Sequence, residues 1–443
     1  MEKKKAVEQI NNEHSYFYSL ELDGINCFKD KQTLDLSDEN GNYSPWTIIL
    51  GDNGTGKTTL LKVLDRMQPD SAAVDLKKLK IDSEGKIFLP QYFISGIEGT
   101  FRNMLSELKE KSISVSLKLI NNDEFRKVEV SSNIDNLDSL YDERFSNSFL
   151  ISYGASRRMS KSTSLKTSVS SKFTSLFDDK IELINAEEWL LQKETLSDLA
   201  EPQSKIKFKR DLELVKNLLK DVLPDVSNIG IKPVNEQNPN LLIEVQTSYG
   251  LVNLRDLSFG YQTLTALIVD IAANMMDKYL NSENPLAEPV IILIDEIDLH
   301  LHPKWQRTVI DKLSYHFPQA QFIVTAHSPL IVQAAQDRDA NIVVCKKEGD
   351  RVIIDNDPES VKGWRIDQIL TSDLFELSSS KSIDFEEIRN EKTSILLKSE
   401  LTDSDKERLD FINIKLNNVP VFSSKEGINA EELIKKAAEL LKK

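Results

Sequence analysis

An uninterrupted octapeptide, Gly51-Asp52-Asn53-Gly54-Thr55-Gly56-Lys57-Thr58, constrains this chain more than any other feature of its sequence. It matches the phosphate-binding pattern G-x-x-x-x-G-K-[ST] without a gap. An apolar run at residues 46–50 precedes it, and leucines at positions 60, 61 and 64 follow at helical spacing. The sequence therefore predicts a buried strand, a glycine-rich loop and a helix in succession.

The chemistry of phosphate binding explains this spacing. Glycines let the loop curl so that backbone N–H groups point inward, and the helix adds the positive end of its dipole. Lys57 is expected to reach the β- and γ-phosphates of a nucleotide, and Thr58 to offer its hydroxyl to Mg²⁺. The alternative is a glycine-rich turn with a chance lysine. The expected nucleotide contacts are Asn53, Gly54, Thr55, Gly56, Lys57, Thr58 and Thr59.

A second apolar run, residues 289–294, ends in Asp295 and Glu296. A strand buried on both faces delivers such acids to the sheet edge where open α/β sheets bind ligands. We therefore expect Asp295 to bind Mg²⁺ and Glu296 to accept a proton from an attacking water. The alternative is that the two acids only cap a helix. His327 follows a third run, 321–325, and is expected to sense the γ-phosphate rather than serve as a structural histidine.

Strands alternating with helices predict an α/β fold with a mainly parallel core sheet. Strands at 16–22 and 32–36 predict an antiparallel N-terminal β lobe, and 180–224 and 258–280 read as helical. At the C-terminal end we expect two helices, one capped by Ser404 with Glu407 and one over 430–441. The expected division is an N-terminal lobe at 1–155, a basic loop and helical insertion at 156–235, a second lobe at 236–365 and a C-terminal helical region at 366–443.

Leu257-Ser258-Phe259-Gly260-Tyr261-Gln262 resembles the signature motif of the ABC/SMC-like ATPases, which include AAA-type OLD and RecF-like proteins. With the phosphate loop and the two strand ends, it implies an ABC/SMC-type P-loop NTPase head. The resemblance implies that Ser258, Gly260 and Gln262 contact the nucleotide held by another copy, in a head dimer or a higher homo-oligomer such as a hexamer. Asp298 would be the D-loop acid. In this family a Q-loop glutamine follows an early strand. No glutamine follows the strand at 149–154, so Gln91 is the candidate for the Q-loop.

Three phrases resemble a narrower group, namely Tyr153-Gly154-Ala155-Ser156-Arg157, the run from Asp295 to Pro303 and Ala326-His327-Ser328-Pro329. They are similar to the PtuA-type ATPases of Septu and retron anti-phage systems, and next to the AriA-type ATPases of PARIS. The resemblance implies an ATPase that controls a separate nuclease of the HNH type. Because the whole sequence has five histidines and the segment after His327 is short for a Toprim nuclease, we expect that this chain is not itself a nuclease. The alternatives are a RecF-like DNA-repair ATPase and an assembly scaffold that holds ATP with little turnover.

The 56 basic and 71 acidic residues give a net charge of −15, which argues against a general nucleic-acid coat protein. Two cysteines argue against a disulfide scaffold, and no apolar run reaches the ~20 residues of a membrane span. We therefore expect a cytoplasmic protein without membrane contact.

Two clusters leave alternatives open. His300 and His302 with Asp298 suggest either a metal site or, as we favour, a subunit contact near the nucleotide. Within a stretch without acidic residues, 144–177, the basic segment 157–172 could contact nucleic acid, form a solvated loop, or place its arginines at the ATP site or a neighbouring subunit. Its cations include Arg157, Arg158, Lys161, Lys166 and Lys172.

Overall fold

The structure is a computed structural model, and it describes residues 14–67, 80–81, 87–88, 113–121, 124–133, 136–140, 148–160, 174–232, 241–375, 383–398 and 402–417. The chain divides into two compact units, Met1–Ile369 and Leu370–Lys443. No helix among the described residues is both long enough and apolar enough to cross a membrane.

The first unit is built on a six-stranded sheet in the order β16-β15-β3-β14-β13-β9. Five of its strands run parallel, and β16 pairs antiparallel with β15 at one edge. These strands are β3 (Trp46–Gly51), β9 (Leu150–Tyr153), β13 (Val290–Ile294), β14 (Ala320–Thr325), β15 (Asn341–Glu348) and β16 (Arg351–Asp355). The predicted fold class, an α/β P-loop NTPase with a mainly parallel core sheet, is confirmed.

A second sheet is antiparallel, in the order β2-β1-β6-β7-β8, and it contains the predicted N-terminal strand pair. Its strands are β1 (Tyr16–Asp23), β2 (Gln32–Asp35), β6 (Ile113–Asn121), β7 (Glu124–Asn133) and β8 (Asn136–Leu140). A third sheet consists of β10 (Val226–Ile231), β11 (Ile243–Thr247) and β12 (Gly250–Asn253). In a fourth sheet, β4 (Lys80–Ile81) pairs with β5 (Ile87–Phe88).

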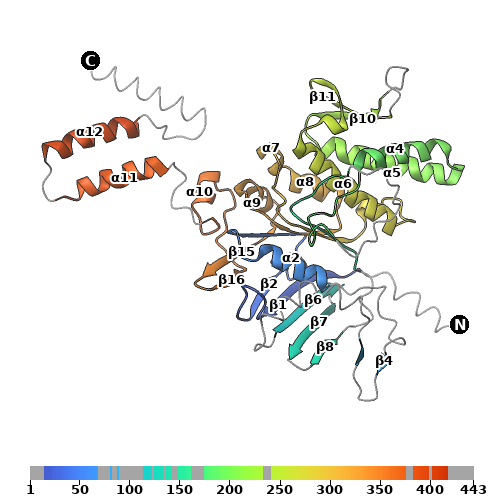
Figure 1. Ribbon diagram of the computed structural model, residues 1–443, viewed down its shortest axis with the longest axis horizontal. Helices are drawn as coiled ribbons and strands as arrows, with labels where there is room; N and C mark the ends of the chain where they lie inside the picture. The colour runs from blue at the N-terminus through green and yellow to red at the C-terminus, as the bar shows by residue number, and fades with distance from the viewer. Residues whose placement is uncertain are drawn as a thin grey trace. The chain divides into compact units, whose positions relative to one another are not determined.

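Helix α2 (Lys57–Arg66) and the antiparallel sheet cover one face of the parallel sheet, whereas α6, α8 and α9 lie over the other (Figure 1). The buried core between the first face and the antiparallel sheet joins residues from both sheets, such as Phe17, Ile49 and Leu293, with Leu60 of α2. The helices over the second face are α6 (Phe259–Lys278), α8 (Val309–His316) and α9 (Pro329–Gln336). Short helices are η3 (Leu254–Asp256), η4 (Pro285–Ala287), α7 (Pro303–Gln306) and α10 (Ile366–Leu370).

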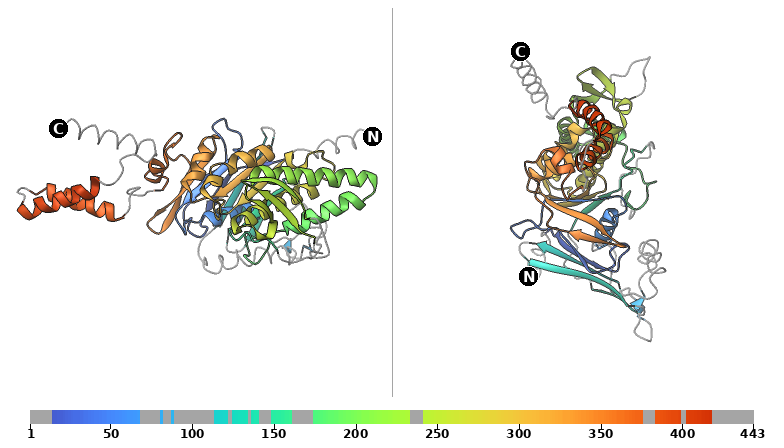
Figure 2. Two further views of the ribbon diagram at one scale, coloured as in Figure 1. Left: turned by 90° about the horizontal axis from the view of Figure 1, so that it is seen from above. Right: turned by 90° about the vertical axis from the view of Figure 1, so that its left-hand side faces the viewer.

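The helical stretch expected at 180–224 forms two helices, α4 (Ala186–Leu199) and α5 (Pro202–Val222), which pack side by side (Figure 2). The break has a local cause, because Ala200 is extended and Pro202 occupies the first turn of α5. Proline lacks the N–H that would continue the preceding helix but fits a helix start.

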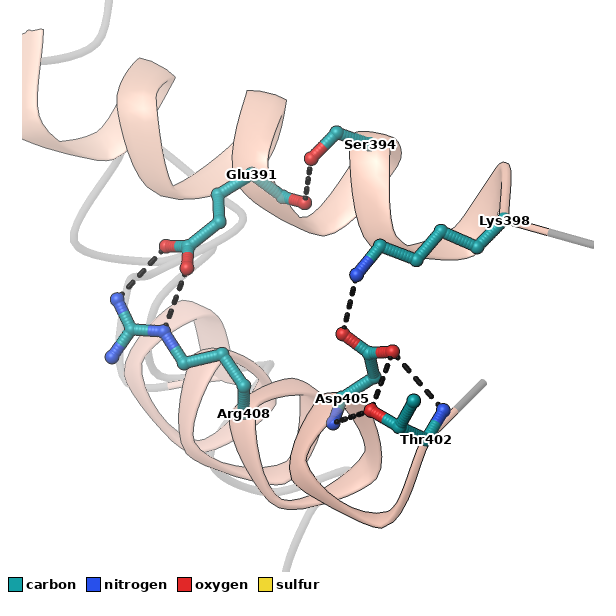
Figure 3. Close-up of polar contacts among 6 residues, drawn as sticks. All are labelled: Glu391, Ser394, Lys398, Thr402, Asp405 and Arg408. Carbon is teal, nitrogen blue, oxygen red and sulfur yellow. Dashed lines mark hydrogen bonds and ion pairs between the residues drawn. The ribbon is translucent and has the colours of Figure 1, made fainter. Parts of the chain in front are cut away.

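The second unit contains the helices α11 (Ile383–Leu396) and α12 (Asp403–Asn417). Arg408 donates from Nε and Nη2 to the carboxylate of Glu391, at 2.7 and 2.9 Å, and Lys398 donates to Asp405 at 2.7 Å (Figure 3). These pairs join the two helices. The sequence did not predict α11, and the helix expected at 430–441 lies outside the described residues.

The predicted cap of α12, Ser404 with Glu407, is wrong by two residues. The amide of Asp405 donates to Thr402 Oγ1 at 3.2 Å, and the Thr402 amide and hydroxyl donate to Asp405 Oδ2 at 3.0 and 2.8 Å (Figure 3). This reciprocal arrangement satisfies two amides at the helix start. The hydrogen bond from Lys398, followed by those from Thr402, lowers the pKa of Asp405 to about 2.

Thr402→Ala should therefore loosen the start of α12. Loss of a threonine cap costs about 1 kcal/mol, which corresponds to roughly fivefold faster exchange of the amides in the first turn. Hydrogen exchange of the full chain followed by mass spectrometry measures this. Ser404→Ala is the matched control and should have little effect; a larger effect at Ser404 would restore the cap predicted from the sequence.

Candidate functional site

The glycine-rich loop joins β3 to α2 at the carboxyl end of the parallel sheet. Gly54 and Gly56 have φ values of 82° and 83°, in the left-handed region that other residues adopt only with strain. A Cβ atom on Gly56 would lie 2.5 Å from Cys27 Sγ. The position therefore requires glycine both for its backbone conformation and because the turn after β1 packs against it.

Lys57 begins α2, and its side chain points back into the loop. Its Nζ donates to the carbonyl oxygens of Gly51 and Asp52, at 2.7 and 2.8 Å, and the residue is 7% exposed. Burial lowers the pKa of this ammonium, and nearby acidic groups, including Asp295 and Glu296, oppose that effect. The loop thus holds a buried cation at its centre.

The carboxylate of Asp295, directly after β13, is held from two sides. Thr58 Oγ1 donates to its Oδ2 at 2.8 Å, and Thr325 Oγ1 donates to its Oδ1 at 2.6 Å. Thr325 Oγ1 also accepts from the Glu296 amide at 2.7 Å. Thr325 was not predicted as a site residue. Its position at the end of β14, directly before Ala326-His327, could have indicated it.

These elements surround a pocket of about 350 Å³. Its lining includes nine residues predicted from the sequence, namely Asn53, Gly54, Gly56, Lys57, Thr58, Thr59, Asp295, Glu296 and His327. Asn26 and Cys27, from the turn after β1, also line it and were not predicted. Thr55 is buried beside it, and its hydroxyl donates to the Asp52 carbonyl at 2.8 Å.

The three residues expected to form a signature, Ser258, Gly260 and Gln262, do not line this pocket within the chain. Ser258 precedes α6 and is exposed, and a Cβ on Gly260 would lie 2.5 Å from the carbonyl oxygen of His300. Gln262 Nε2 donates to the carbonyls of Arg255 and Leu257, at 2.9 and 2.8 Å. The signature is therefore packed against the segment that follows Glu296 in the same chain.

The histidines near Asp298 are not part of a metal-binding cluster. Among the described residues, no group of three or more His, Cys, Asp or Glu side chains is placed to hold a metal ion. Asp298 Oδ2 instead accepts from the backbone amide of His327 at 3.1 Å. His302 Nδ1 accepts from the Lys304 amide at 3.3 Å and caps α7, whereas the ring of His300 packs edge-on against Phe259. Their part in a subunit contact stays a prediction.

The basic stretch divides between the interior and the surface. Arg157 is 3% exposed and donates to the backbone carbonyls of Asp295 and Glu296. A buried side chain cannot contact nucleic acid, so this part of the prediction for the basic stretch is wrong. The contacts support the alternative that Arg157 serves the nucleotide site. Arg158 is exposed. Lys161, Lys166, Lys172 and Gln91 lie outside the described residues.

The donor set of the pocket fits Mg²⁺. The Thr58 hydroxyl and an Asp295 carboxylate oxygen lie 2.8 Å apart and both line the pocket. Hard oxygen ligands of this kind, together with phosphate oxygens and waters, are those that Mg²⁺ takes in nucleotide sites.

The family described as "AAA domain, putative AbiEii toxin, Type IV TA system" matches residues 47–333, well over half of the chain. The chain belongs to this AAA family. A further AAA-domain model matches residues 19–66, which extends the match to the strand pair before the loop.

Curated relatives of this chain include proteins named after Septu and retron systems. Septu protein PtuA of Bacillus mycoides is 26% identical over 380 residues, which cover 84% of this chain and 46% of PtuA. Retron Vc95 probable ATPase of Vibrio cholerae is 37% identical over 134 residues, which cover 30% of this chain and 25% of that protein. The matches thus span less than half the length of these relatives. The resemblance to ATPases of Septu and retron systems is confirmed.

Among solved structures, the SMC head bound to the C-winged helix domain of ScpA matches with 16% identity and a TM-score of 0.42. The match covers 77% of this chain and 97% of that structure. The fold class stated above depends instead on the strand order and the phosphate loop of this chain.

Thr325→Val should destabilise the first unit because it removes the hydroxyl that serves both Asp295 and the Glu296 amide. Leaving a buried donor and a buried carboxylate oxygen unsatisfied costs about 1–3 kcal/mol. The measurement is the urea concentration at half-unfolding, which should fall. Thr325→Ser keeps the hydroxyl and should remain near the wild type; equal stability of wild type and Thr325→Val would contradict the arrangement.

Proposed function

We propose that this chain binds and hydrolyses ATP as the ATPase subunit of an anti-phage defence complex. The observation that carries the proposal is the convergence of Lys57, Asp295, Glu296 and His327 on one pocket at the carboxyl end of a parallel sheet. A buried cation, a hydroxyl–carboxylate pair and a second carboxylate are what phosphoryl transfer to water requires.

Each group has a distinct role in the proposed reaction. Lys57 and the amides at the start of α2 bind the β- and γ-phosphates. Thr58 and Asp295 would hold Mg²⁺, which, when bound, neutralises charge on the phosphate oxygens. Glu296 accepts the proton of the attacking water, and His327 contacts the γ-phosphate. The amides of residues 53–59 cradle the phosphates.

Oligomerisation is the second part of the proposal. Ser258, Gly260 and Gln262 lie outside the pocket of their own chain, which supports a contact with nucleotide bound by another copy. The protein would then work as a head dimer or a higher homo-oligomer such as a hexamer. The names of the Septu and retron relatives support a role in a system of this kind. In the proposed system the protein is cytoplasmic, and a separate nuclease of the HNH type is the cutting subunit.

Glu296→Gln should slow ATP hydrolysis about 100-fold or more, as expected when a general base is lost, and should leave ATP affinity unchanged. Phosphate release at saturating ATP and calorimetric titration measure the two effects. Lys57→Ala is the control for binding and should lose nucleotide affinity. Wild-type turnover in Glu296→Gln would assign water activation to another group, and unchanged affinity in Lys57→Ala would contradict the phosphate loop.

Tagged Glu296→Gln protein isolated from its native host with ATP and Mg²⁺ should carry a nuclease in stoichiometric amount, because slow hydrolysis preserves the assembled state. Mass spectrometry and nucleic-acid staining identify what co-elutes, and Lys57→Ala is the control that should not assemble. A homo-oligomer carrying DNA and no nuclease would favour a RecF-like repair function. Protein without any partner would contradict the defence assignment.

A further inference from the structure

Arg157 lies in the turn after β9 and is enclosed by the protein. Its Nη2 donates to the carbonyl oxygen of Glu296 at 2.9 Å, and its Nη1 donates to the carbonyls of Asp295 and Gly154, the latter at 3.3 Å. Arg157 is absent from the pocket lining, whereas the Asp295 and Glu296 residues line it. The guanidinium therefore contacts the turn from behind.

The turn that Arg157 contacts is held in an unusual conformation. Glu296 has a φ of 50°, in the left-handed region, which costs a residue with a side chain roughly 1–2 kcal/mol. The carbonyls of Asp295 and Glu296 both accept from one guanidinium, while the Glu296 amide donates to Thr325. The peptide between the two acids is thus fixed on both sides, by Arg157 in the turn after β9 and by Thr325 at the end of β14.

The positive charge of Arg157 is complementary to the acidic groups around it. A guanidinium stays protonated in proteins, and the carboxylates of Asp295, Asp298 and Glu296 lie near that of Arg157. Hydrogen bonds from a charged donor are stronger than neutral ones, and the guanidinium fork reaches two carbonyls at once.

The turn that carries Arg157 is itself anchored. The Gly154 amide donates to Ser175 Oγ at 3.1 Å, and a Cβ on Gly154 would lie 2.2 Å from the Ser175 carbonyl oxygen. Contact this close leaves room only for glycine, so Arg157 projects from a backbone that cannot shift freely.

We propose that Arg157 is a positioning residue for the hydrolysis proposed above, and that it acts by holding the Asp295–Glu296 peptide so that both carboxylates face the bound nucleotide. It does so through backbone carbonyls and does not touch the nucleotide. This role rests on the proposed function, because it concerns the rate of the same reaction.

The test compares Arg157→Gln and Arg157→Lys with the wild type in ATP turnover and ATP binding. Arg157→Gln should lower kcat about 10- to 100-fold, the range for loss of a group that orients reacting residues, and should leave KM and the Kd for ATP within about threefold. Arg157→Lys keeps the charge but not the fork and should restore part of kcat. Arg338→Gln, which removes a cation from a surface ion pair with Asp311, is the control and should match the wild type.

Three results would overturn the role of Arg157 while the wild type hydrolyses ATP. These are an unchanged kcat in Arg157→Gln, a raised KM at unchanged kcat, and parallel losses of kcat, affinity and melting temperature in both variants. If Arg157→Gln does not fold, Arg157→Lys decides, because a wild-type kcat there would contradict the need for the fork. Absence of phosphate release by the wild type would overturn the proposed hydrolysis itself and this role with it.

Discussion

The hydrogen bonds to the Asp295 carboxylate are the constraint on which the site depends. They join the first turn of α2, the end of β13 and the end of β14, three places far apart in the chain. Strand order makes this possible, because β14 lies between β3 and β13 in the sheet and all three run parallel. The residues that follow these strands therefore meet at one edge. The sheet brings together the phosphate loop, the two acids and His327. The hydroxyls of Thr58 and Thr325 then fix the position of the Asp295 carboxylate.

The sequence predicts the parts of the site that follow from local patterns. The loop Gly51–Thr58 and the acids after residues 289–294 carry their chemistry in neighbouring residues, so their placement at strand ends could be inferred without the fold. Thr325 and the buried contacts of Arg157 could not be inferred in this way, because their meaning depends on which strand lies beside which. The prediction of the cap of α12 failed for a different reason. The pair Thr402 with Asp405 overlaps the predicted pair, and the contact of Asp405 with Lys398, which follows α11, favours the pair that begins at Thr402.

Helix α6, which follows the expected signature residue Ser258, is held in two places. Near its middle, Asp270 accepts from Tyr153 at the end of β9, at 2.8 Å, and from the Ile184 amide at 3.1 Å. Burial raises the pKa of Asp270, and these hydrogen bonds oppose that effect. At its start, Gly260 packs against the carbonyl of His300, four residues after Glu296. Helix α6 is thus held by the residue that ends β9, the strand beside β13, and by the segment that follows Glu296.

The net charge of the chain and the buried cations near the pocket have opposite effects on a bound anion. A chain with a net charge of −15 repels polyanions at long range, and its pocket contains Asp295 and Glu296 as well. The compensating charges are internal, since Lys57 lies at the floor of the loop and Arg157 behind the acids, both nearly inaccessible to solvent. Salt screens buried charges much less than exposed ones. In the proposed function, the affinity for nucleotide comes from these fixed cations and the start of α2, despite the negative net charge of the chain.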